Sequence, residues 1–153
     1  MKMTNNMFNS KTEIALRILL TLYTSEENLS VDDLVIYDFM TIYAKDFGLT
    51  SYNLHGDNNS KESEFAARRQ QVKEAIRFLV TQGYVDIEES ERGFLFAASK
   101  KGIALCDAME SAYAADYTAA AIKVTEYARH HDLEVLLSTI NRKALKFHEE
   151  GAK

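Results

Sequence analysis

The stretch "GYVDIEESERGFLFAAS", residues 83–99, decides the fold predicted for this chain. Apolar and polar residues alternate before the turn at residues 91–93, and a second apolar run follows it. This pattern predicts two short strands joined as a hairpin. Segments with helical periodicity stand on both sides of it. A hairpin placed between helices in this way is typical of the wing of a winged-helix domain.

The charge of this hairpin is the opposite of what a DNA-binding wing needs. Wings usually lie along DNA, where lysine and arginine meet phosphates, but here one arginine, Arg92, faces four carboxylates: Asp86, Glu88, Glu89 and Glu91. The whole chain of 153 residues carries a net charge of −5, and its pI is near 5.4. Because non-specific DNA binding is mostly phosphate neutralisation, a general nucleic-acid-binding function is not expected, although a local basic patch remains possible.

Helical patterns surround the hairpin on both sides. Helices are predicted over residues 12–23, 30–45, 63–82 and 99–109. The first is apolar around most of its circumference, which predicts burial, and Ser30 with Asp33 resembles a capping box at the start of the second. The order helix, helix, helix, hairpin, helix predicts a mainly α fold, a winged-helix domain with a two-stranded β wing.

A long helical tail follows this predicted domain. Tyr113, Tyr117 and Val124 belong to an apolar stripe at helical spacing, and a second stripe follows a predicted break at "RHHD", residues 129–132. We therefore expect a winged-helix domain at residues 12–109 and a C-terminal helical extension at residues 110–147. Exposed apolar stripes of this kind would favour aggregation, so the tail is expected to pack on its own domain or to contact a second subunit.

The sequence predicts no enzyme, no cofactor and no metal. The chain contains no phosphate-binding glycine loop and no nucleophile elbow. Cys106 lies in an apolar helical stripe, where a small core residue is the expected reading. The strand Asp86-Ile87-Glu88 has the alternating carboxylates of a metal nuclease, but Ser90 occupies the place of the required lysine. The single cysteine and the lack of a signal-type or membrane-spanning apolar run indicate a cytoplasmic protein.

One basic stripe on the third predicted helix is a mild functional signal. Arg69, Lys73 and Arg77 stand four residues apart, with Arg68 beside them, on the helix that a DNA-binding winged helix would insert into the major groove. Three readings stay open: a solvated face with salt bridges, a phosphate contact, or a surface for an acidic partner.

Four tyrosines are the candidate partner interface: Tyr37, Tyr43, Tyr113 and Tyr117. The first two widen the apolar face of the second helix beyond what a small core needs. Tyrosine offers a large contact area with little entropy to lose, which enriches it at interface hot spots. We expect some of these rings to become buried only in a complex; the alternative is that they line the domain's own core.

Five stretches, read in order, resemble the small middle component of ABC-three-component systems, which include the Lamassu antiphage defence operons. They are "MFNSKTEIALRILLTLY", "LVIYDFMTIYAKDFG", the pair Leu54-His55, "FAARRQQVKEAIRFLVTQGYV" and "GFLFAASKKGIALCDAMESAYA". The resemblance covers about residues 6–128. It implies a non-enzymatic subunit that holds together an SMC/Rad50-like ATPase, which senses foreign DNA, and an effector subunit, often a nuclease.

The sequence is therefore read as an adaptor in phage or plasmid defence, which contacts DNA only indirectly through its complex and does not contact a membrane. The rival reading is a dimeric winged-helix DNA-binding transcriptional regulator. Helices at both ends of the winged helix would suit dimerisation, and the basic stripe could contact DNA, whereas the acidic hairpin and the low pI oppose this reading.

Overall fold

The computed structural model describes residues 10–56 and 61–151. Its elements are α2 (Lys11–Thr24), α3 (Val31–Ile42), the 3-10 helix η1 (Ala44–Phe47), α4 (Lys61–Thr81), β1 (Val85–Ser90), β2 (Gly93–Ala98), α5 (Lys100–Asp107), α6 (Ala112–Arg129) and α7 (Leu133–Gly151). The predicted mainly α fold with a small two-stranded hairpin is confirmed, as is the predicted order of the elements.

Serine caps start four of these helices. The side chains of Ser10, Ser30, Ser99 and Ser111 each accept a hydrogen bond from the backbone N–H three residues later. The capping box predicted at Ser30 is present, since the Asp33 carboxylate also accepts from the Ser30 N–H at 3.0 Å. The helix that it starts ends at Ile42, before the predicted end near residue 45, because the chain tightens into η1 and turns at Gly48 with φ 75°.

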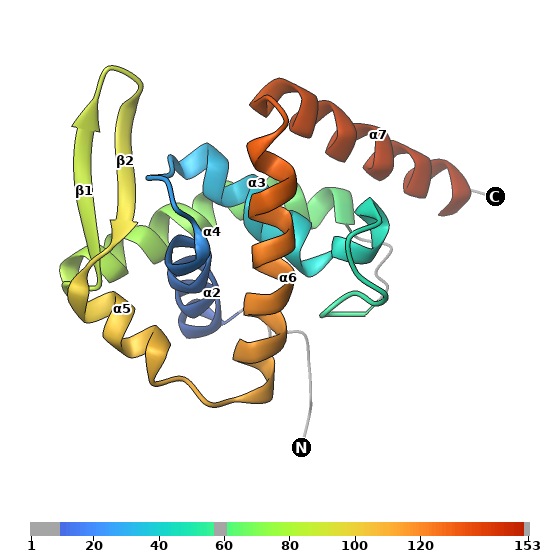
Figure 1. Cartoon of the computed structure of the whole chain (residues 1–153). Coiled ribbons are helices and arrows are strands. Elements are labelled where there is room, and N and C mark those ends of the chain that lie inside the picture. Colours follow the sequence, from blue (N-terminus) through green and yellow to red (C-terminus); the bar gives the residue numbers. More distant parts are fainter. Residues whose placement is uncertain (1–9, 57–60, 152–153) are drawn as a thin grey trace.

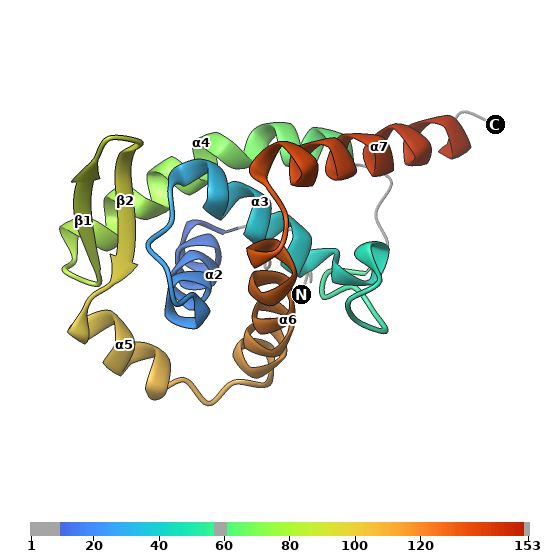
Figure 2. The ribbon, with the colours of Figure 1, turned by 45° about the horizontal axis from the view of Figure 1, so that its top comes forward.

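Helix α2 lies at the centre of the molecule. It contacts α4, α6, α3, α5 and β2, and its Ile18 and Leu19 are fully buried. Helix α6 crosses both α2 and α3, while α7 lies against α4 and α3 (Figures 1 and 2). The hairpin stands at one side of this helical body, and the C-terminal end of α7 points away on the other side.

The inward face of α6 joins the main core. Tyr117, Ala121 and Val124 are each 0% exposed, and alanines on this face allow the helix to approach α2 and α3 closely. The stripe of α6 is therefore covered by the chain's own domain, which is one of the two expectations for the tail. In α7, Leu136 and Ile140 are buried in the same core.

The hairpin is attached to the core through Phe96. Ile87 pairs with Phe96, and Leu29 adds a bridge to the other side of Phe96, through N–H···O=C bonds of 3.0 and 2.8 Å. Phe96 and Leu29 therefore enter the core. Ile87, although it lies opposite Phe96, is 50% exposed, and Phe94, close to the turn, is 60% exposed. The hairpin thus contacts the core through Phe96 and leaves these two apolar side chains partly exposed to water.

Candidate partner-binding site

The basic stripe of α4 is divided between the surface and the interior. Arg69, Lys73 and Arg77 are exposed, whereas Arg68 is 0% exposed. Helical geometry explains the difference, because Arg68 is turned about 100° from Arg69 and shares a face with Val72. The Arg68 side chain is consequently not available to DNA or to an acidic partner at the surface of this structure.

The three exposed members of the stripe have different surroundings. Arg69 forms a surface ion pair with Asp32 of α3, in which both side chains are about half exposed. Among the residues that the structure describes, neither Lys73 nor Arg77 forms an ion pair. The cationic character of this face is therefore concentrated at the C-terminal half of α4.

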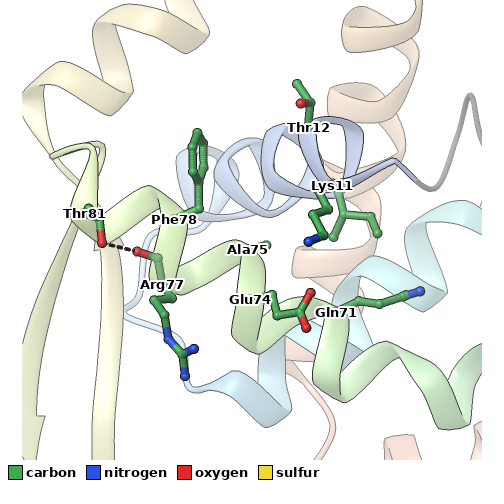
Figure 3. A pocket seen from close by; sticks show the side chains of 9 residues that line it. Lys11, Thr12, Gln71, Glu74, Ala75, Arg77, Phe78 and Thr81 are labelled. Atoms are coloured by element: carbon green, nitrogen blue, oxygen red, sulfur yellow. Dashed lines mark hydrogen bonds between the residues drawn. The ribbon is translucent and has the colours of Figure 1, made fainter.

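A groove of about 690 Å³ runs between the start of α2 and this half of α4. Its lining residues are Lys11, Thr12, Ile14, Gln71, Glu74, Ala75, Arg77, Phe78 and Thr81. Ile14 and Ala75 are buried, and Phe78 is 52% exposed. Figure 3 shows Arg77 and Phe78 leaving α4 in different directions, with Phe78 on the side of α2. The groove combines an apolar base with cations at its rim, and its volume lies in the range of ligand and side-chain pockets.

A buried ionic cluster connects α2 and α4, the two helices that line this groove, with α3 and α6. The Asp38 carboxylate of α3 accepts two hydrogen bonds from Arg17 of α2, at 3.0 Å from Nε and 3.3 Å from Nη2. Nη1 of Arg68 lies 3.0 Å from Oδ2 of Asp38, and the Tyr117 hydroxyl of α6 donates to Oδ1 at 2.7 Å. Thr21 Oγ1 lies 2.9 Å from the Tyr117 hydroxyl. The cluster joins α2, α3, α4 and α6 through one carboxylate.

The electrostatics of the cluster keep Asp38 ionised. Burial alone would raise its pKa, but the guanidinium groups of Arg17 and Arg68 and the hydrogen bonds from Arg17 and Tyr117 lower the pKa below its usual value. Burial and the nearby Asp38 raise the pKa of Tyr117 well above its usual value. The phenol therefore stays protonated and serves as a donor. This arrangement suits a fixed structural junction between helices.

The four candidate interface tyrosines fall into two groups. Tyr43 and Tyr117 are each 0% exposed, so the chain's own elements already enclose their rings. Tyr37 and Tyr113 are half-buried. Tyr113 lies 2.6 Å through its hydroxyl from Nε2 of His55. Only Tyr37 and Tyr113 keep surface that a partner could cover, and their role in binding remains a prediction.

The hairpin forms a second, acidic surface. Asp86, Glu88, Glu89 and Glu91 are all exposed, together with Arg92. Glu88 accepts a hydrogen bond from Nδ2 of Asn28. The hairpin and the α4 groove thus present surfaces of opposite charge.

The described residues include no activated thiol and no cluster of metal-ligating side chains. Cys106 is buried, and burial, with a contribution from Asp107, raises the pKa of its thiol to about 12, so the thiolate is not formed near neutral pH. No group of three or more His, Cys, Asp or Glu side chains suited to a metal ion occurs among the described residues. Within that part of the chain, no helix is long and apolar enough to cross a membrane.

Reasoning from the sequence missed the groove and the centre of the cluster. Ile14, Ala75 and Phe78 look like ordinary core positions in a helical pattern. Arg17 and Asp38 gave a usable signal, since each is a charged residue within an otherwise apolar helical segment. Such a residue is seldom fully buried without a partner of opposite charge.

Comparison with known protein families gives a match over most of the chain. The family model described as ABC-three component (ABC-3C) system Middle Component 2 matches residues 7–150. No curated protein and no solved structure matches the chain.

Proposed function

The chain belongs to the Middle Component 2 family of ABC-three component systems, and from this we propose that it is a non-enzymatic adaptor in an antiphage or antiplasmid defence complex of the Lamassu type. It would bridge an SMC-like ATPase and an effector subunit, often a nuclease. The observation that carries this proposal is the family match, which extends over nearly the whole chain.

The two charged surfaces support a bridging role. An adaptor must hold two different proteins without exchanging them, and charge complementarity is a strong source of such selectivity. The α4 groove has Lys11 and Arg77 at its rim, whereas the hairpin carries four carboxylates and one arginine, a balance of −3. A partner suited to one of these surfaces would be repelled by the other.

The proposed mechanism is steric and allosteric. The buried cluster around Asp38 fixes α2, α3, α4 and α6 relative to one another, so the adaptor would move as one body. It would hold the effector inactive and release or reorganise it when the ATPase engages DNA. Contact with DNA would then be indirect, through the complex.

Co-expression of the tagged chain with the other components of its system tests the adaptor function. We expect one complex that contains all components, with a mass that gives its stoichiometry. Omitting the chain should separate the ATPase from the effector. If the ATPase and the effector copurify equally well without the chain, the bridging role is wrong.

The second candidate is a dimeric winged-helix DNA-binding regulator. The specific observation in its favour is the exposure of Arg69, Lys73 and Arg77 on α4. A gel shift of the isolated chain at low salt separates the two functions. Tight binding that is lost on replacing Arg69 and Lys73 would favour the regulator, because these side chains would then be neutralising phosphates.

A further inference from the structure

We propose that the groove between α2 and α4 receives one large apolar side chain from an acidic segment of another component of the same ABC-three component system. This inference rests on the proposed adaptor function and names the chemistry of one partner contact. The occupant is a short stretch of polypeptide with a leucine-sized or aromatic side chain flanked by carboxylates.

The apolar part of the argument comes from the shape of the groove. Ile14 and Ala75, 3% and 5% exposed, form its base, while Phe78 remains 52% exposed on α4. A half-exposed phenylalanine beside an apolar hollow leaves surface that an inserted side chain would remove from water. Removing one such side chain from water is favourable enough to make the contact an interface hot spot.

The charge part of the argument selects the neighbours of that side chain. Lys11 and Arg77 line the groove with Glu74 as the single carboxylate in the lining, and Lys73 stands one turn before Arg77. Among the described residues, no ion pair neutralises these three cations. This face is therefore locally positive on a chain whose net charge is −5. Carboxylates beside the inserted side chain would complement it.

The two helices that line the groove are joined by the buried ionic cluster. Asp38 binds Arg17 of α2 and Arg68 of α4. Ile14 lies about one helical turn from Arg17, and Ala75 lies about two turns from Arg68. The two walls of the groove are thus held close to a buried junction. A preorganised site loses little conformational entropy on binding, which favours affinity.

The test uses two groove variants and two matched controls in the co-expressed system. Phe78→Ala removes the exposed aromatic wall, and its control is Ile122→Ala, which truncates an apolar helix residue that is 54% exposed. Lys11→Glu reverses a charge at the first residue of α2, after the cap Ser10. Its control, Lys100→Glu, reverses the charge at the first residue of α5, after the cap Ser99.

Each groove variant is expected to reduce the recovered complex on the order of tenfold, while both controls recover it as the unaltered chain does. Denaturant unfolding of each isolated variant serves as the folding check; Lys11 is exposed and Phe78 is 52% exposed, so neither substitution removes a fully buried side chain. Unchanged recovery with Phe78→Ala would overturn the proposal and leave the adaptor function standing. Unchanged recovery with Lys11→Glu alone would overturn the acidic nature of the occupant.

Two further outcomes distinguish this proposal from failure of the adaptor function and from self-association of the chain. If the unaltered chain recovers no other component, the adaptor function fails and the groove proposal falls with it. If the isolated chain has the mass of a dimer that Phe78→Ala converts to a monomer, while the complex with the other components persists, the occupant is a second copy of this chain and the proposal is overturned.

Discussion

At the scale of single residues, Asp38 joins four helices through one buried carboxylate. A buried carboxylate is costly to desolvate, and the cost is offset here by Arg17, by Arg68 and by the Tyr117 hydroxyl. Removing one member of such a cluster leaves the others buried without compensation. The loss is then much larger than the net value of the intact interaction.

Asp38→Asn is therefore expected to lower the free energy of unfolding by about 3 kcal/mol or more, because two guanidinium groups would stay buried beside a neutral amide. Urea unfolding of the isolated chain measures this. Asp32→Asn is the control, since Asp32 and Arg69 form an ion pair about half exposed to water, and its loss should be below about 1 kcal/mol. Equal effects of the two substitutions would contradict the assigned role of Asp38.

His55 gives the molecule a pH dependence of its own. Its pKa is lowered to about 4, first by burial and then by the positive charge of Arg17, with Asp38 opposing and Arg68 adding. The ordinary value is 6.5. Between these two values the unfolded chain binds a proton that the folded chain does not, so stability falls as the pH drops from about 6.5 to about 4.

His55→Gln should flatten this part of the stability profile, because glutamine does not titrate there. Urea midpoints across the window, compared with those of the exposed-histidine variant His130→Gln, measure the effect. The loss of stability at low pH will be smaller than the full pKa difference implies, since His55 is only half-buried. Asp38 behaves differently, because its pKa is lowered in the folded chain. Its contribution to stability is lost only when the pH falls below the ordinary pKa of 3.8. A profile of His55→Gln as steep as that of the unaltered chain would contradict the assignment.

At the scale of elements, helical periodicity predicted most of the structure. The helix expected over residues 12–23 is Lys11–Thr24, and that expected over 63–82 is Lys61–Thr81. The hairpin was predicted because strand alternation and a turn are local signals. The pairing of Arg17 with Asp38 could not be predicted, since it depends on how α2 crosses α3. The groove likewise depends on the distance between two helices whose lining residues, such as Ile14 and Ala75, are about 60 positions apart in the chain.

The close contact between α5 and the base of the hairpin is another feature that hydrophobic periodicity does not predict. Gly102 lies so near Tyr84 that an added Cβ would stand 2.2 Å from the Tyr84 carbonyl oxygen and 3.1 Å from Leu19 Cδ1. That oxygen already accepts the Ser99 N–H at 3.0 Å. The backbone therefore has little room to move away from a larger residue.

Gly102→Ala is expected to destabilise the chain by about 2 kcal/mol or more through this overlap. The sign of this stability change is informative, because replacing glycine by alanine inside a helix normally stabilises a protein by up to about 1 kcal/mol. Thermal or urea unfolding measures it. Gly93→Ala is the comparison: no atom lies within 4 Å of its added Cβ, but its φ of 95° disfavours alanine, so a cost of about 1 kcal/mol is expected. A stabilised Gly102→Ala protein would show that α5 is not held against the hairpin.

At the scale of the whole molecule, net charge limits direct contact with nucleic acid. The chain carries −5 overall, its hairpin is acidic, and Arg68 is buried. The exposed cations of α4 are therefore few, and counterion release on binding a duplex would be small.

The isolated chain is accordingly expected to give no shift of a short DNA duplex at physiological salt, and at most a weak, salt-sensitive shift at low salt. An electrophoretic mobility assay over a salt series measures this, with the assembled complex as the comparison. Tight binding by the isolated chain at physiological salt would contradict the prediction and would favour the regulator.

The position of Tyr117 along the chain also has a consequence for biosynthesis. The hydroxyl that donates a hydrogen bond to Asp38 comes from α6, in the last third of the polypeptide. While the ribosome is still translating the earlier helices, the nascent protein lacks this donor and the apolar stripe that surrounds it. The interior therefore closes only after most of the chain has been synthesised, and a stalled translation product would present apolar core residues to chaperones and proteases.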